Sequence, residues 1–239
     1  MELKFLGRGA GFNPSEGSTS SYFIDKDEFF LIDCGESIFK TILENKLLDP
    51  VKALNIFITH THTDHIGSLG SLVLYSFVVK KIPVKIIIDQ NMGYLSKLKS
   101  FLDIVGLTSS MYDFADASSY EGKYSVFNSV KYFKTTHCAE VEACGILFET
   151  DTGLTLYSGD SNDISMIKEI INSGSKINKI YVDSNNDTEP NLHHISIHQV
   201  NGIVPAELKS KIYCMHINND KCKEEALAYG FNVVELLAS

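Results

Sequence analysis

Short apolar runs alternate with longer segments of helical periodicity along the whole chain. Runs rich in β-branched and aromatic residues predict strands at Leu3–Leu6, Ser21–Ile24, Glu28–Ile32, Asn55–Thr59, Val84–Ile88, Val130–Thr135, Gly145–Thr150, Leu154–Ser158, Lys179–Asp183, Lys211–Met215 and Asn232–Leu236. Segments whose apolar residues recur every three or four positions predict helices at Ser37–Asn45, Gly67–Val79, Asn91–Val105, Asp163–Asn172, Ile197–Ile203 and Asp220–Tyr229. The glycine-rich stretch 7–17 predicts a loop, and Asp151-Thr152-Gly153 predicts a tight hairpin turn.

This order, a group of strands followed by alternating strands and helices, occurs twice along the chain. Two sheets packed face to face with helices on their outer sides accommodate such an order. The predicted fold class is therefore α/β, a four-layer αββα sandwich. The 239 residues and the hydrophobic fraction of 44% support one sizeable core, so we expect a single domain over residues 1–239.

Four side chains that can bind metal follow directly on the apolar strand that ends at Thr59. They are His60, His62, Asp64 and His65, in the order His-x-His-x-Asp-His. One histidine in a loop usually only satisfies backbone groups, but three histidines and a carboxylate at a rigid strand end can converge on one point. Imidazole and carboxylate together suit zinc, and also manganese or iron. The stretch therefore predicts a metal site.

The same stretch, Ile58–Gly67, resembles the signature of the metallo-β-lactamase superfamily. The resemblance extends in order to Leu31–Gly35, Thr136–Cys138, Tyr157–Asp160 and Cys214–His216. It implies the metallo-β-lactamase fold and two divalent metal ions, with zinc as the first expectation and manganese as the alternative. It also implies the ligand sets: His60, His62 and His137 for one ion, Asp64, His65 and His216 for the other, and Asp160 as the bridge between them.

Asp183 ends a predicted strand and His194 precedes a predicted helix. This arrangement resembles the tRNase Z-like phosphodiesterase branch, in which an acidic residue orients a histidine that protonates the leaving alkoxide. The resemblance implies these roles for Asp183 and His194, and a role for Asp64 as ligand and proton acceptor. Adjacent His193 is a rival for the acid, and His198 lies one turn further on. The alternative is that this histidine-rich run only caps a helix, with Ser196 as the capping residue.

The charge of the chain argues against a large nucleic-acid substrate. The formal net charge is −9 and Arg8 is the only arginine, whereas proteins that bind a nucleic-acid backbone offer a basic stripe. The tRNA-processing members of the branch carry a glycine- and proline-rich arm. It lies between the metal loop, which corresponds here to His60–His65, and the third histidine ligand, which corresponds here to His137. Here residues 80–130 contain one proline, Pro83, and predict strand and helix. Both features favour a small phosphodiester.

Lys4–Gly9, Ser18–Tyr22 and the compact length resemble one subgroup, the anti-Pycsar phosphodiesterases of phages. The resemblance implies hydrolysis of cyclic mononucleotides, such as cyclic CMP and cyclic UMP, to nucleoside monophosphates. It further implies evasion of host cyclic-nucleotide immune signalling and a homodimer. The alternatives are a tRNA 3′-processing endonuclease, a lactonase or thioester hydrolase, and a nucleotide-binding decoy without activity.

The remaining features concern location, thiols and aromatic residues. The first residues lack the apolar run of a secretory signal, and the apolar stretch Ile66–Val79 is too short to span a bilayer, so we expect a cytoplasmic protein without a membrane segment. Five cysteines without a CxxC pair predict buried thiols, although Cys138 beside His137 could act near the metals. Three tyrosines could cover a base, with ordinary packing as the favoured interpretation: Tyr112, Tyr120 and Tyr124.

Overall fold

The computed structural model describes residues 1–89, 91–188 and 192–237. The described residues form two six-stranded sheets. The first sheet has the order β1 (Lys4–Gly7), β2 (Ser20–Asp25), β3 (Glu28–Ile32), β4 (Ala53–Phe57), β5 (Val84–Ile88) and β6 (Asp113–Asp116). The second sheet has the order β12 (Asn232–Val233), β11 (Ile212–Met215), β10 (Ile177–Asp183), β9 (Gly153–Tyr157), β8 (Ala143–Thr150) and β7 (Ser129–Thr135).

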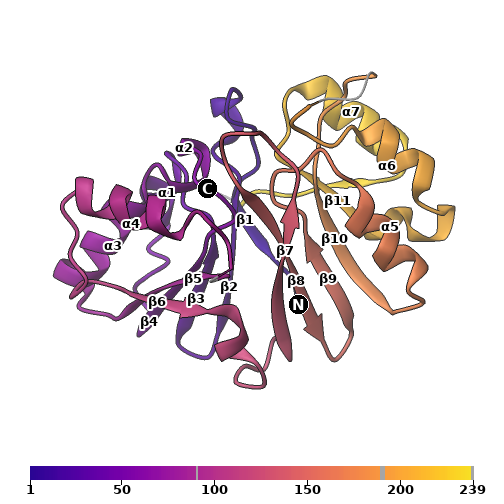
Figure 1. Ribbon diagram of the computed structural model, residues 1–239. Coiled ribbons are helices and arrows are strands. Elements are labelled where there is room, and N and C mark those ends of the chain that lie inside the picture. The colour runs from indigo at the N-terminus through magenta and orange to yellow at the C-terminus, as the bar shows by residue number, and fades with distance from the viewer. Residues whose placement is uncertain (90, 189–191, 238–239) are drawn as a thin grey trace.

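The helices lie on the outer sides of the two sheets (Figure 1). Those associated with the first sheet are α1 (Ile38–Glu44), α2 (Thr63–Ile66), α3 (Leu69–Tyr75) and α4 (Leu95–Ile104). Those associated with the second are α5 (Ser165–Asn172), α6 (Ile197–Ile203) and α7 (Asp220–Ala228). Shorter helical turns are η1 (Pro14–Glu16), η2 (Ser76–Lys80), η3 (Ala117–Tyr120) and η4 (Ala206–Lys211). The predicted αββα sandwich is confirmed.

Three apolar clusters explain this layering. Strand β3 is buried on both faces, as expected for a sheet covered on both sides. Its Phe29 and Leu31 belong to the cluster between the first sheet and its helices, whereas Phe30 and Ile32 face the second sheet. Phe57 continues the inner cluster, where its ring centroid lies 6.3 Å from that of Phe30. A third cluster packs the second sheet against α5, α6 and α7.

The parallel strands of each sheet place their carboxyl ends at one edge of the sandwich. Strands β3, β4 and β5 run parallel, as do β9, β10 and β11. In open sheets with this topology, ligands bind beyond the carboxyl ends of the strands. His60 follows β4, Asp160 follows β9, Asp183 ends β10 and His216 follows β11. The fold therefore brings candidate residues from both sheets to the same edge.

Several local predictions need correction. The segment that follows the predicted strand Asn55–Thr59 contains helix α2, which was not predicted, and the expected helix Gly67–Val79 ends as the π-helical turn η2. Strand β6 was not predicted, because its sequence Asp113–Asp116 lacks a clear apolar alternation. Tyr112 and Tyr120 are buried, and Tyr120 stacks on Tyr124 with ring centroids 5.5 Å apart, so the packing interpretation is confirmed.

Among the described residues, no helix has the length and apolar character needed to cross a membrane.

Candidate metal centre and catalytic site

The first cluster of possible metal ligands joins the two sheets. His60 and His62 follow β4, and His137 follows β7. His62 Nδ1 lies 3.1 Å from His60 Nε2 and 3.1 Å from His137 Nε2. Asp160 Oδ2 lies 3.8 Å from Nε2 of both His60 and His137. The structure thus brings together the three histidines that were expected to bind one ion.

The second cluster contains Asp64, His65, Asp160 and His216. His65 Nε2 lies 3.4 Å from Asp64 Oδ2 and 3.3 Å from Asp160 Oδ1. His216 Nε2 lies 3.3 Å from Asp64 Oδ2 and 3.3 Å from Asp160 Oδ2. Asp160 approaches both clusters, in the place expected of a bridging carboxylate.

These side chains fit divalent metal ions. Four ligands about 2.0–2.1 Å from a tetrahedral ion lie about 3.3–3.4 Å from one another, which agrees with the spacing in the second cluster. His65 Nε2 is a buried nitrogen that has no hydrogen-bond partner among the described residues. A buried polar atom without a partner is costly, and coordination would satisfy it. The mixture of imidazole and carboxylate suits zinc and also accommodates manganese.

Two buried carboxylates hold the histidines of the second cluster from behind. His65 Nδ1 donates to Asp33 Oδ2 at 2.8 Å, and His216 Nδ1 lies 3.2 Å from Asp183 Oδ1. Such contacts leave Nε2 of each ring as the nitrogen that can bind a metal ion. Asp33 and His216 both have positive φ, 62° and 54°, a strained conformation for these residues that the surrounding contacts must maintain.

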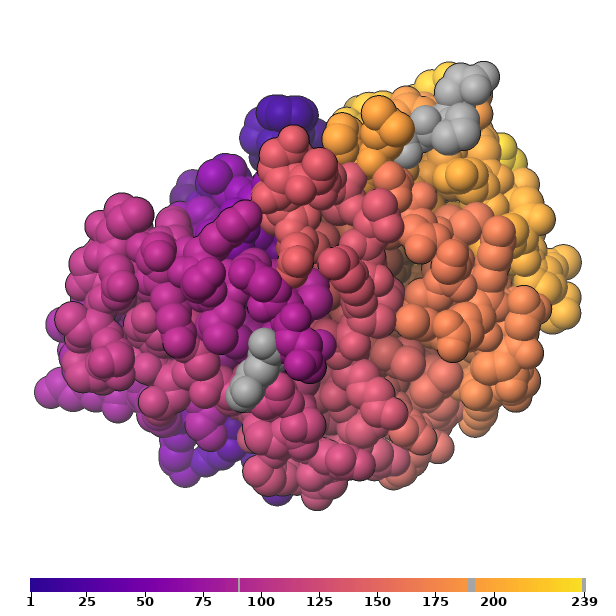
Figure 2. Space-filling model, viewed as in Figure 1, coloured from indigo at the N-terminus to yellow at the C-terminus, as the bar shows by residue number. Residues whose placement is uncertain are grey.

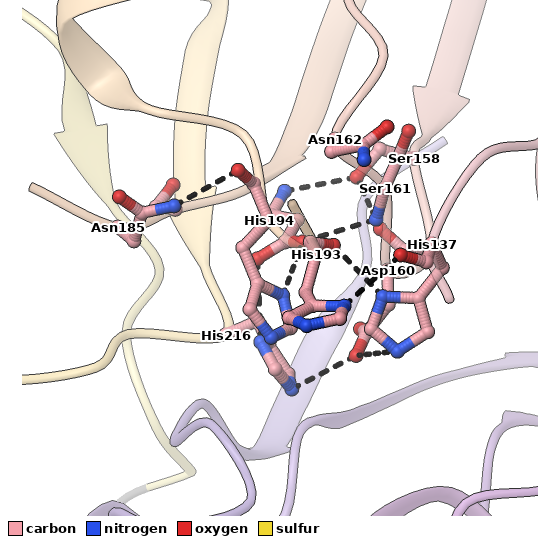
Figure 3. A network of polar contacts seen from close by, with 12 residues as sticks. His137, Ser158, Asp160, Ser161, Asn162, Asn185, His193, His194 and His216 are labelled. Atoms are coloured by element: carbon pink, nitrogen blue, oxygen red, sulfur yellow. Dashed lines mark hydrogen bonds and ion pairs between the residues drawn. The ribbon is translucent and has the colours of Figure 1, made fainter. Parts of the chain in front are cut away.

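Asp183 contacts three other groups as well as His216. Its Oδ2 accepts hydrogen bonds from His194 Nδ1 at 2.8 Å and from the backbone N–H of Ser161 at 3.0 Å, and its own backbone N–H donates to Ser158 Oγ at 2.8 Å. Figure 3 shows His194 and His216 side by side in this network, and their ring centroids are 5.0 Å apart. One carboxylate therefore positions both an expected metal ligand and the expected acid.

The ring of His193 and the ring of His137 each contact the backbone carbonyl of the other residue. His137 Nδ1 donates to the carbonyl of His193 at 2.8 Å, and His193 Nδ1 lies 3.2 Å from the carbonyl of His137 (Figure 3). His198 is directed elsewhere, with Nδ1 at 2.7 Å from Tyr229 Oη. Ser196 does cap α6, as the capping interpretation expected. Capping nevertheless leaves His194 paired with Asp183 and does not account for that pair.

The electrostatics of the site follow from burial and close charges. Burial lowers the pKa of His60 well below its ordinary value, which favours the neutral, metal-binding form. Burial alone raises the pKa of Asp160, but the charges of His216 and His65 outweigh it and hold this pKa well below its usual range. Burial likewise lowers the pKa of His194, and the charge of Asp183 reverses the effect and raises it.

The clusters lie in a cavity of about 670 Å³. Its walls come from the loop 9–13, the metal loop, the segment after β7, and the segments around Asn185 and Asn218. Cys138 lines it with Sγ at 3.7 Å from His62 Nε2, while the other four cysteines are buried as predicted. Phe12 also lines the cavity and was not singled out from the sequence. The only sequence signal near it is the glycine-rich stretch 7–17.

Comparisons with known proteins identify the family and the fold. A family model described as anti-Pycsar protein Apyc1 matches residues 1–234. The metallo-β-lactamase fold protein YhfI from Bacillus subtilis superposes with a TM-score of 0.73 at 15% identity, covering 99% of this chain and 96% of that one. The short form of human tRNase Z superposes with a TM-score of 0.63 at 17% identity, covering 99% and 96%.

A curated Ribonuclease Z from Streptococcus uberis is 37% identical over 111 residues. That match covers 44% of this chain and only 36% of the relative's own length. The structural likenesses show the fold, and the family match spans nearly the whole sequence.

Proposed function

Because the chain belongs to the anti-Pycsar Apyc1 protein family, we propose that it is a two-metal phosphodiesterase that hydrolyses cyclic mononucleotides, such as cyclic CMP and cyclic UMP, to nucleoside monophosphates. The observation that carries this proposal is the pairing of His194 with Asp183 beside two clusters of possible metal ligands. Cleavage of a phosphodiester needs a proton for the leaving alkoxide, and a lactonase would not need this pair.

In this proposal His60, His62 and His137 hold one divalent ion, and Asp64, His65 and His216 hold the other, with Asp160 as the bridge. The ions, zinc or alternatively manganese, supply an activated water and neutralise charge on the phosphoryl oxygens. The side chain of Asp64 is 14% exposed and faces the cavity, so it can also accept the proton released as water adds to phosphorus.

His194 is proposed as the general acid. Its Nδ1 is bonded to Asp183, and its ring centroid lies 5.1 Å from that of His137, so the ring stands directly beside the ligand clusters. The imidazolium gives its proton to the 3′ oxygen as the bond from phosphorus to that oxygen breaks. His193 is the weaker candidate, because its Nδ1 contacts the neutral carbonyl of His137, which stabilises an imidazolium less than the carboxylate of Asp183 does.

The size and charge of the molecule favour a small substrate. A cavity of about 670 Å³ is in the range of small-molecule sites. Between β5 and β7 the chain forms helix α4, strand β6 and turn η3, where tRNA-processing enzymes of the branch carry their arm. The identity to Ribonuclease Z keeps tRNA 3′ processing as a second candidate, but it covers a minority of that enzyme.

The biological setting is part of the same proposal. Membership of an anti-Pycsar family supports removal of cyclic-nucleotide immune signals. The sequence resemblance adds two expectations to this proposal, that the protein acts in the host cytoplasm and that it acts as a homodimer. We also propose one catalytic domain over residues 1–239, because each ligand cluster draws side chains from both sheets.

The test is to load purified protein with zinc or manganese and incubate it with cyclic mononucleotides, cyclic dinucleotides and a pre-tRNA. We expect cyclic mononucleotides to be converted and pre-tRNA to remain intact. The Asp64→Ala variant should be inactive. His194→Ala should lose about 100- to 10,000-fold in kcat and keep the metal content of the wild type, whereas His198→Ala serves as the matched control with unchanged kcat. Cleaved pre-tRNA with untouched cyclic nucleotides would establish the second candidate instead.

A further inference from the structure

One aromatic ring stands in solvent at the mouth of the candidate catalytic cavity. Phe12 is fully exposed, at 105% of its reference accessible area, which is the largest value of any large hydrophobic residue in the described part of the chain. It nevertheless lines the same cavity as Asp64 and His194. Burial of a phenyl ring is strongly favourable, so the fold forgoes that gain at this position. The ring contributes nothing evident to the core and is available to a ligand.

The loop that carries Phe12 is fixed by the segment that follows the expected metal ligand His216. The backbone N–H of Ala10 donates to the carbonyl of Ile217 at 3.0 Å, and Asn13 Nδ2 donates to the same carbonyl at 3.0 Å. The backbone N–H of Ile217 in turn donates to the carbonyl of Arg8 at 2.7 Å. The exposed ring therefore lies on an anchored turn. Little conformational entropy of this turn would be lost when the ring binds a ligand.

The only arginine of the chain supports this anchoring. Arg8 Nε lies 2.7 Å from Glu16 Oε2, which closes the base of the loop, and Arg8 Nη1 donates to the carbonyl of Val234 at 2.7 Å. Figures 1 and 2 show the loop as an indigo projection at the top of the molecule, between the halves formed by the two sheets. Arg8 thus has a structural role on the face that carries the cavity.

Gly11 brings the turn directly against the ligand clusters. A Cβ atom added at Gly11 would lie 3.0 Å from Oδ2 of Asp64, so a side chain there would press on that carboxylate. Phe12 is the next residue. The cavity accordingly has metal-binding carboxylates and imidazoles on its floor and an aromatic ring at its rim. This arrangement matches a ligand with an anionic phosphodiester at one end and a flat π-system at the other.

We propose that Phe12 stacks on the base of the nucleotide substrate while its phosphodiester lies at the ligand clusters. The inference rests on the proposed phosphodiesterase function and names the residue that binds the other end of the substrate. Every nucleobase offers a π-face, so stacking adds affinity with little choice among bases. Stacking on Phe12 would allow one cavity to accept several cyclic mononucleotides.

The test compares a cyclic nucleotide with a substrate that lacks the base, methyl ribofuranoside 3′,5′-cyclic phosphate. Phe12→Ala should lower kcat/KM for cyclic CMP roughly 5- to 150-fold, mainly through KM, and should leave kcat/KM for the base-free substrate unchanged. Phe12→Tyr and Phe12→Trp should retain activity. Phe12→Leu keeps an apolar side chain without a π-face and should resemble Phe12→Ala. The control is Ile104→Ala, which alters an 84% exposed apolar residue on α4 that does not line the cavity.

The outcomes separate this inference from the function on which it rests. If the wild type cleaves both substrates and Phe12→Ala lowers both equally, the stacking role is wrong while the phosphodiesterase function stands. If Phe12→Ala converts a dimer into monomers in analytical ultracentrifugation and activity falls for that reason, the ring packs on a second copy of the chain, and the inference is overturned. If the wild type cleaves no cyclic nucleotide, both proposals fail together.

Discussion

Replacing Asp183 by asparagine should separate metal retention from proton donation. The carboxylate is fully buried, with Oδ2 bonded to His194 and to the backbone N–H of Ser161, and with Oδ1 3.2 Å from His216 Nδ1. Asparagine has the same shape but only one accepting oxygen. The Ser161 N–H cannot move, so the amide oxygen takes the Oδ2 position and the amide NH₂ faces His216. His216 must then accept at Nδ1 and carry its proton on Nε2, the nitrogen proposed to bind metal.

The expected loss of metal affinity follows from this conflict between two donors, the amide NH₂ that Asp183→Asn introduces and the Nδ1–H of His216. Loss of the carboxylate behind a metal-binding histidine typically costs 10- to 100-fold in metal affinity. We therefore expect Asp183→Asn to bind metal about 10- to 100-fold more weakly at the second cluster. The amide oxygen keeps its contact with His194, so part of kcat should return when zinc or manganese is raised to saturation.

The assay is a metal titration read by calorimetry, together with kcat for a cyclic mononucleotide at each metal concentration. His194→Gln should show the opposite behaviour, with metal affinity as in the wild type and a kcat that added metal does not restore. Asp163→Asn, an exposed aspartate on the approach to α5, is the matched control. Wild-type metal affinity in Asp183→Asn would refute the role of Asp183 behind His216. An unchanged kcat in both variants would refute the acid assignment as well.

Asp33→Asn should weaken metal binding about 10- to 100-fold in the same titration, because Asp33 is the corresponding acceptor for His65, and an unaltered affinity would contradict the assignment. Gly11→Ala should lower kcat/KM by less than the roughly 100-fold that a misplacement of about 1 Å costs, because a Cβ 3.0 Å from Asp64 Oδ2 presses on that carboxylate. Gly202→Ala, whose Cβ meets no atom within 4 Å, is the kinetic control, and equal values for the two variants would contradict the expectation. Chelation should lower the midpoint of thermal unfolding of the wild type, since an ion at a thousand times its Kd stabilises the folded state by about 4 kcal/mol. In scanning fluorimetry, chelation should lower the midpoint of Asp64→Ala by less than that of the wild type. An equal decrease in the two proteins would show that the lost metal is bound elsewhere.

The parts of the site that the sequence predicts are those close together in it. The metal loop is visible because His60, His62, Asp64 and His65 occupy neighbouring positions after an apolar strand. His137 and the other distant ligands carry no local signal of their own, and only their order within a resemblance indicates them. A lone histidine or turn aspartate is common in any fold, so periodicity could not have selected these residues.

The features that escaped prediction depend on contacts between distant segments. The approach of Gly11 to Asp64 requires the backbone bonds between Ala10 and Ile217, which no local pattern encodes. The sequence also could not show which of the adjacent residues His193 and His194 is the general acid. The two histidines have the same sequence environment and differ only in their hydrogen-bond partners. Only the folded chain directs His193 to the carbonyl of His137 and His194 to Asp183.

The distribution of the proposed metal ligands between the two sheets predicts that metal binding and folding are coupled. The first sheet supplies His60, His62, Asp64 and His65, and the second supplies His137, Asp160 and His216. Each cluster therefore contains side chains from both sheets, and neither sheet alone could complete one. An ion bound in either cluster would link the two layers across the edge at which their strands end. Since an unfolded chain cannot present these groups together, the binding free energy adds to the stability of the packed sandwich.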